Sequence, residues 1–126
     1  MTRGLGERLA AHGVPFGHWA FLRILWQEDG LTQRRLSALA GMTEPTTTAA
    51  LKAMEEAGHV QRRQTRENRK NVYVHLTARG RALEKKLVPL AEEVNKIAVR
   101  GVAAADVAVT RRALLAIAEN LARSQE

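Results

Sequence analysis

The fold can be predicted from residues 31–63, LTQRRLSALAGMTEPTTTAALKAMEEAGHVQRR. This segment contains the signals for two helix starts and one helix end at short spacing. Thr32 stands where the N-cap of a first helix is expected, and Gly41 stands where that helix would end. Thr43 is a candidate cap for a second helix, with Pro45 in its first turn, where proline is tolerated. Two short helices joined by a glycine-containing turn form a helix-turn-helix.

The second of these predicted helices has two faces that differ in chemistry. The positions that we expect to face inward are Thr47, Ala50, Leu51 and Met54. The outward face is small and polar, which suits a helix that enters the major groove of DNA. The candidate DNA-binding residues on it are Thr46, Thr48, Ala49 and Lys52. A helix that packs on a protein partner would show the same surface, so this alternative stays open.

After Gly58 the pattern changes from helical spacing to alternation, which is typical of half-buried strands. HVQRRQT and NVYVHLT flank the basic segment RENRK, so we expect two strands joined by a basic tip, the wing of a winged helix. The candidate DNA-binding residues of the wing are Arg62, Arg63, Arg66, Arg69 and Lys70. With Glu67 as their single acid, they hold more than half of the formal net charge of +7. Such a segment suits a polyanionic partner such as DNA, and a merely solvated loop is the other interpretation.

Two amphipathic helices follow the wing. Thr77 is placed to cap the first, and the apolar positions of that helix are Leu83, Leu87, Leu90, Val94 and Ile97, with Pro89 inside it. The candidate dimerisation residues on the second helix are Val107, Leu114, Ile117 and Leu121. A winged helix needs only part of this apolar surface for its own core, so the surplus predicts a homodimer. In the alternative, the stripes fold back on the winged helix of the same chain.

The composition limits the class of protein. The chain has 126 residues, enough for one domain, and 45% of them are hydrophobic. No cysteine is present, which excludes disulfides and thiolate metal sites. There is no apolar run long enough to span a membrane, and the N-terminal residues lack the apolar core of a signal peptide. We therefore expect a cytoplasmic protein with no membrane partner.

The residue types that support catalysis are not arranged for it. The four histidines are His12, His18, His59 and His75, and they form neither an HExxH pair nor a visible metal-ligand cluster. The sequence has no glycine-rich phosphate loop, and no serine lies in a nucleophile-elbow context. We predict a protein that is not an enzyme and needs no cofactor.

In their order and spacing, these segments resemble the MarR family of bacterial transcriptional regulators. The resemblance extends from Phe16 to Arg123, and its matching pieces are the segment quoted above, the basic tip, VHLTARGRALE and LLAIAENLAR. It implies a homodimeric repressor that binds a pseudopalindromic DNA operator, and such regulators are often released by a small aromatic acid or phenol. The alternative function is a winged-helix module that binds other proteins and no specific DNA.

The resemblance also implies the architecture. The fold would be mainly α with a small two-stranded β-wing, and residues 1–126 would form a single unit. Residues 16–77 would make the winged helix that binds DNA. Residues 1–15 and 78–126 would supply the dimerisation helices.

Two positions depart from the family's pattern. Ala49 stands where the recognition helix often has an arginine, which leaves methyl contacts to thymine from Ala49 and the threonines. In the wing, Glu67-Asn68-Arg69 is the preferred counterpart of the family's Asp-x-Arg element, and Asn68-Arg69-Lys70 is the alternative. In the preferred alignment, Arg69 would enter the minor groove of an A·T-rich site.

An effector site is a further implication, at the place where the helix predicted at 16–28 meets the winged helix and the dimer helices. The candidate ligand-binding residues there are His12, Phe16, His18, Trp19 and Arg23. Arg23 is the only fully charged side chain in the middle of that apolar helix, and a buried arginine needs a partner. The partner would be an acid of this protein or the carboxylate of an aromatic ligand whose ring stacks on Trp19.

Overall fold

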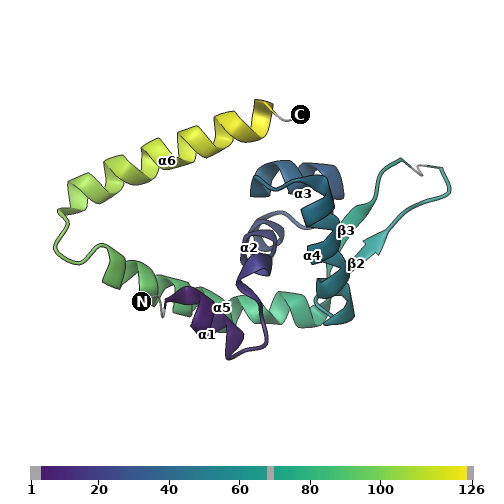
Figure 1. The fold of residues 1–126 in the computed structure, drawn as a ribbon, viewed down its shortest axis with the longest axis horizontal. Coiled ribbons are helices and arrows are strands. Elements are labelled where there is room, and N and C mark those ends of the chain that lie inside the picture. The colour runs from purple at the N-terminus through teal and green to yellow at the C-terminus, as the bar shows by residue number, and fades with distance from the viewer. Residues whose placement is uncertain (1–3, 68–69, 125–126) are drawn as a thin grey trace.

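The structure, a computed structural model, describes residues 4–67 and 70–124. Asn68 and Arg69, which include the expected minor-groove residue, lie outside the described residues. In chain order the elements are α1 (Leu5–Ala10), η1 (Phe16–His18), α2 (Trp19–Gln27), β1 (Leu31–Thr32), α3 (Gln33–Ala40), α4 (Glu44–Glu56), β2 (Val60–Arg63), β3 (Tyr73–Leu76), α5 (Ala78–Ala98) and α6 (Ala104–Ser124). The fold is mainly helical with a small antiparallel sheet, as the sequence predicts (Figure 1).

The sheet has three strands in the order β1-β3-β2, so the prediction of a two-stranded wing was incomplete. The β2–β3 hairpin has the expected antiparallel register, with Val60 opposite Leu76. The additional strand, β1, pairs Leu31 with Val74. It forms because the N-cap residue Thr32 has an extended backbone, with ψ at 152°, and brings the preceding leucine beside β3. Two residues are too few to show an alternating pattern in the sequence.

The helix starts that the sequence predicts around the turn are confirmed. The Thr32 hydroxyl accepts a hydrogen bond from the backbone N–H of Arg35 at 3.1 Å, and the Thr43 hydroxyl accepts one from Thr46 at 3.2 Å. Gly41 ends α3 with φ at +67°, a left-handed conformation that glycine adopts without a steric penalty. Local side-chain chemistry therefore sets both boundaries of the turn.

The helix predicted at 16–28 begins later than expected, because its first turn is the 3₁₀ helix η1 and only residues from Trp19 on are α-helical. Three side chains of α2 are fully buried, namely Phe21, Leu22 and Leu25. Figure 1 shows α2 in the middle of the molecule, between the helix-turn-helix and α5. Burial between two layers explains why this helix is apolar on more than one side.

A close approach of two backbones joins the winged helix to α5. The Thr77 hydroxyl accepts a hydrogen bond from Gly80 N–H at 3.0 Å and donates one to the carbonyl oxygen of Gly58. The Thr77 N–H donates to the carbonyl oxygen of His59 at 3.0 Å, and the indole N–H of Trp26 donates to Gly80 at 3.0 Å. A Cβ atom at Gly80 would overlap the His59 carbonyl group. Glycine is therefore required at this position for the helix to begin where it does.

Helix α6 lies apart from most of the molecule and contacts α3 near its C-terminal end, where Ala122 is buried (Figure 1). Three of its apolar residues are strongly exposed, Leu114 at 61%, Ile117 at 55% and Leu121 at 59%. The structure therefore argues against the alternative in which this stripe folds back on the winged helix of the same chain. No helix in the described part of the chain is long and apolar enough to cross a membrane.

Substituting Gly80 tests the close approach between α5 and the turn before β2. We expect Gly80→Ala to lower the free energy of unfolding by about 1–3 kcal/mol, because the new methyl group would push the two backbones apart. Gly17→Ala is the matched control, since a Cβ atom there would meet nothing within 4 Å. Urea denaturation followed by circular dichroism measures both variants. Equal unfolding midpoints for the two variants would contradict the close approach.

Candidate nucleic-acid interface

The outward face of α4 is exposed along its length, as the sequence predicts. Thr47, Leu51 and Met54 are fully buried, and Ala50 is half-buried. The exposed positions include the candidate DNA-binding residues Thr46, Thr48, Ala49 and Lys52. Three of these four side chains are small and uncharged, so the backbone of the helix can approach a partner closely.

A short chain of buried hydroxyl groups fixes α4 relative to α3. Thr47 and Ser37 are both buried, and their hydroxyl oxygens are 2.9 Å apart. Ser37 donates to the carbonyl oxygen of Met42 at 2.7 Å, and the Thr47 hydroxyl also lies 2.9 Å from the carbonyl oxygen of Thr43. Each of these polar groups has a partner, which is the condition for placing it in an apolar core at little cost. These hydrogen bonds hold the turn between α3 and α4 and thereby fix the direction in which the outward face of α4 points.

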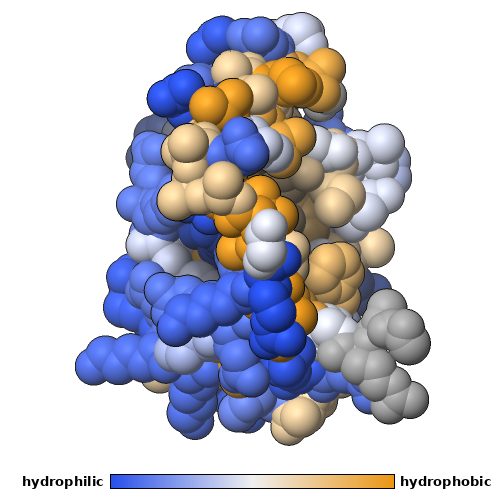
Figure 2. All heavy atoms as spheres, turned by 90° about the vertical axis from the view of Figure 1, so that its left-hand side faces the viewer, coloured by the Kyte–Doolittle hydropathy of each residue, from blue (hydrophilic) through white to orange (hydrophobic). Residues whose placement is uncertain are grey.

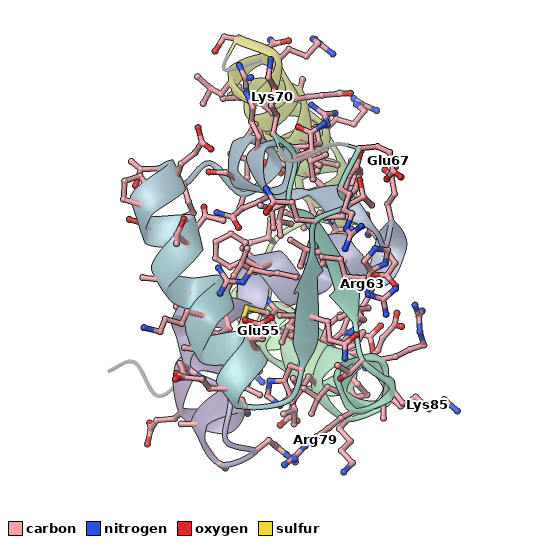
Figure 3. The ribbon with its side chains drawn as sticks, turned by 90° about the vertical axis from the view of Figure 1, so that its right-hand side faces the viewer. Glu55, Arg63, Glu67, Lys70, Arg79 and Lys85 are labelled. Carbon is pink, nitrogen blue, oxygen red and sulfur yellow. The ribbon has the colours of Figure 1, made fainter. Side chains whose placement is uncertain are left out.

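The wing carries exposed cations, with one exception. Arg63, Arg66 and Lys70 are exposed, and Figure 3 shows Arg63, Glu67 and Lys70 distributed along the hairpin. The Nη2 atom of Arg63 donates to the side-chain oxygen of Gln61 at 3.0 Å. In the described part of the wing, these three cations are the arginine and lysine residues available to a polyanion.

Arg62 is the exception, because its guanidinium group is bound within the protein. Its Nε and Nη2 atoms donate to Oε1 of Glu55 at 3.2 and 3.0 Å, and its backbone N–H donates to Oε2 of Glu55 at 3.1 Å. The backbone hydrogen bond, followed by the side-chain hydrogen bonds, holds the pKa of Glu55 below its ordinary value. The pair joins α4 to β2, so Arg62 fixes the wing against the helix and is not one of the exposed cations.

Residues at the start of α3 extend this surface, and sequence reasoning missed them. A polar cleft lies between the N-terminal turns of α3 and α4 and the segment that precedes β3. It is lined by Thr32, Gln33, Arg34, Glu44, Lys70, Asn71 and Val72. Arg34 is exposed there. The sequence signal was the pair of arginines at positions 34 and 35, close after the Thr32 cap, which places basic side chains at a helix start beside the wing.

Known proteins share this arrangement of elements. Residues 17–72 match the model of the MarR family. A curated relative from Methylorubrum extorquens, the HTH-type transcriptional regulator TtmR, is 32% identical over 68% of this chain and 44% of its own length. The crystal structure of a MarR transcriptional regulator from Methanosarcina mazei has a TM-score of 0.82 at 27% identity, over 92% of this chain and 84% of that chain. Residues 17–72 belong to the MarR family.

A structure solved with DNA is also similar to this chain, and the curated relatives are longer than the chain. A putative MarR family regulator from Listeria monocytogenes, solved in complex with a 26mer DNA, has a TM-score of 0.80 at 22% identity, over 96% of this chain and 81% of that chain. The chain spans about half the length of the curated relatives that it matches, from 44% to 61% of the first three. For the Listeria protein, the likeness shows a shared fold.

The candidate effector residues of the chain are only partly brought together. His18 and Trp19 are buried, whereas His12 and Phe16 are exposed. The prediction of a buried Arg23 was wrong, since this side chain is exposed and its Cζ atom lies 5.8 Å from the centre of the Trp19 ring. An arginine can lay its apolar stem and the face of its guanidinium group on an aromatic ring while its charge stays in water. Arg23 therefore does not require a buried acid or a ligand carboxylate as its partner.

His18 and His59 form a second polar feature in the interior of the protein. Both are buried, and the Nδ1 atom of each has no hydrogen-bond partner among the described residues. Burial lowers the pKa of His18, and the nearby His59 lowers it further. Burial likewise lowers the pKa of His59, with a smaller contribution from the positive charge of Arg79. Both imidazoles are thus held neutral at the place where η1 and the turn before β2 meet.

These two histidines predict a pH dependence of stability. In the unfolded chain each titrates near 6.5, while in the folded protein each pKa is lower, so the unfolded state binds more protons as the pH falls. The stabilisation is complete above pH 6.5 and is lost as the pH falls below that value. We expect the free energy of unfolding, measured by urea denaturation, to be lower at pH 5.5 than at pH 7.5.

His18→Gln should flatten this dependence, and the matched control His12→Gln, at an exposed position, should not. The readout is the difference in free energy of unfolding between the two pH values, so a general loss of stability does not obscure it. An unchanged difference in His18→Gln would contradict the assignment of the effect to the buried imidazole.

Proposed function

We propose that this chain is a DNA-binding transcriptional regulator that acts as a repressor and binds a pseudopalindromic operator as a homodimer. The observation that carries the proposal is the exposed, nearly uncharged face of α4 beside the exposed cations Arg63, Arg66 and Lys70 of the wing. Membership in the MarR family supports it, as do the name of the Methylorubrum relative and the DNA complex of the Listeria structure. Each part of the surface has a role on duplex DNA.

In this proposal, α4 enters the major groove and the wing follows the phosphate backbone. A helix with threonine and alanine on its outer face can lie deep in the groove and contact base edges, while lysine and arginine side chains neutralise phosphates. Lys52 on α4 and Arg66 in the wing contact phosphates on either side of the groove. Arg69 enters the adjacent minor groove, where a narrow A·T-rich site attracts arginine.

The homodimer rests on the exposed apolar surface of α6 and of the segment before it. Figure 2 shows hydrophobic side chains gathered over this end of the molecule, above a hydrophilic lower part. The exposed large apolar residues there are Ile97, Val99, Val102, Val109, Leu114, Leu115, Ile117 and Leu121. Leu114, Ile117 and Leu121 share one face of α6, and an exposed apolar face of this kind marks an interaction site. A second copy of the chain supplies a matching surface by two-fold symmetry and places two α4 helices side by side.

Effector control is the finer part of the proposal. An aromatic acid would place its ring near Trp19, whose neighbour in the core is Trp26, 5.7 Å away in an edge-to-face arrangement. The exposed Arg23 would pair with the carboxylate from the solvent side. Such a ligand changes DNA affinity only if it binds one arrangement of the winged helix and dimer helices better than another.

Salt titration on a duplex selected from a random-sequence pool tests DNA binding. We expect log K to fall linearly with log salt concentration, with a slope of about −0.9 for each phosphate neutralised. Arg66→Ala and Lys70→Ala should each reduce that slope by about 1 unit or less. Arg62→Ala should leave the slope nearly unchanged, because its charge is already paired with Glu55.

Two results of this titration would count against the proposal. Failure of the wild-type chain to enrich or bind any duplex would favour the alternative, a winged helix that binds other proteins. An equal loss of slope in Arg62→Ala and Arg66→Ala would mean that the Glu55–Arg62 pair opens on DNA, which contradicts the role given to Arg62.

Leu114→Asp tests the dimer. A carboxylate in the centre of the subunit interface would be buried without a partner, so we expect monomer or aggregate where the wild type is a dimer at micromolar concentration. Ala116→Asp is the matched control, because it adds the same charge on the opposite side of α6. Light scattering gives the molar mass. A wild-type monomer, or a dimer that survives Leu114→Asp, would contradict this interface.

A further inference from the structure

Three threonines in succession at the start of α4 have three different hydrogen-bonding states. Thr47 points inward and is fully buried. Thr46 and Thr48 point outward on the proposed DNA-binding face. Their hydroxyl groups differ in what remains available to a partner, and this difference decides which bases each can recognise.

The single proton of the Thr48 hydroxyl already takes part in a hydrogen bond within the protein. It donates to the carbonyl oxygen of Glu44 at 2.9 Å, one helical turn back. It also accepts a hydrogen bond from the side-chain amide Nε2 of Gln33, on α3, at 2.7 Å. A hydroxyl group has one proton to donate, so Thr48 has none left for an acceptor on a base.

The Thr46 hydroxyl is in a different state. Its oxygen accepts a hydrogen bond from the Thr43 hydroxyl at 2.9 Å. Among the described residues, its own proton has no acceptor. Thr46 can therefore donate to a base or phosphate oxygen without breaking a bond within the protein.

Because the Thr48 hydroxyl is engaged by Glu44 and Gln33, the group of this exposed side chain that remains for a partner is its methyl, and the next residue, Ala49, is also exposed. In the major groove the apolar group that a methyl can contact is the C5-methyl of thymine, whereas guanine and adenine present acceptors at N7. We propose that Thr48 recognises thymine through its methyl group, and that Gln33 is a positioning residue that holds the Thr48 hydroxyl in place. This inference rests on the proposed function, since it assumes that α4 enters the major groove.

Two substitutions at Thr48 separate the methyl from the hydroxyl. Thr48→Val keeps the methyl group and removes the hydroxyl, and Thr48→Ser does the reverse; the three residues have similar helix propensities. On the selected duplex we expect Thr48→Val to bind within about twofold of wild type. Thr48→Ser should bind roughly three- to tenfold more weakly, the effect of losing one buried methyl contact. Thr46→Val is the matched control and should weaken binding, because it removes a free donor.

Replacement of single thymines by uracil in the duplex identifies the contact. Uracil lacks only the C5-methyl group, so one position in each half-site should show a penalty with the wild-type chain and none with Thr48→Ser. Gln33→Ala should reduce the same penalty while leaving the salt dependence of binding unchanged, because threonine divides between two rotamers in a helix once its hydroxyl is released. Valine has one strongly preferred rotamer there, so the methyl group in Thr48→Val keeps its place without Gln33. That combination distinguishes a positioning role from a phosphate contact or a general loss of structure.

The outcomes of these measurements are distinct. If Thr48→Val weakens binding as much as Thr46→Val while Thr48→Ser binds normally, the hydroxyl makes the contact and the inference is overturned. A uracil penalty that persists in Gln33→Ala overturns the positioning role alone. If the wild-type chain does not prefer the selected duplex to random DNA, the proposed function fails first.

Discussion

The contact between the His59 carbonyl group and Gly80 fixes the winged helix relative to α5, and the arrangement of the remaining elements depends on it. The turn before β2 and the first turn of α5 approach so closely that no side chain fits between them. Thr77 bonds to both segments, and Trp26 of α2 donates to the Gly80 carbonyl. Three parts of the chain that are distant in sequence thus meet at one point.

Asp29 reinforces this junction from the end of α2. Its Oδ1 atom accepts from the backbone N–H of Leu76 and its Oδ2 atom from Nη2 of Arg81, both at 2.8 Å. The last residue of β3 and the first turns of α5 are therefore tied to the same carboxylate. In a dimer formed through α6, the position of the winged helix relative to α5 would set the distance between the two α4 helices. His59 itself provides the carbonyl group of this junction, and the buried His18 lies near it.

Much of this fold could be predicted from the sequence because it is set by local chemistry. Thr32, Thr43 and Thr77 each begin a helix through a bond to a backbone N–H three residues ahead, which a sequence shows directly. The outward face of α4 follows from helical spacing alone, and the alternation around RENRK predicts the hairpin. The family resemblance added the expectation of a dimer, which spacing suggested only through surplus apolar surface.

The features that the sequence did not reveal depend on contacts between segments. The strand β1 exists because β3 lies beside it, and its two residues carry no pattern of their own. The role of Arg62 depends on the register that brings Glu55 to it, so composition grouped it with the other wing cations. Arg23 was expected to be buried because its helix is apolar, yet it lies over Trp19 at the surface.

Hydroxyl-radical footprinting of the chain on a duplex selected from a random pool tests the central claim, that two copies place their α4 helices in neighbouring major grooves. We expect two protected blocks related by two-fold symmetry, on one side of the duplex and centred about one helical turn, roughly 34 Å, apart. A single protected block, or uniform protection without a boundary, would contradict it.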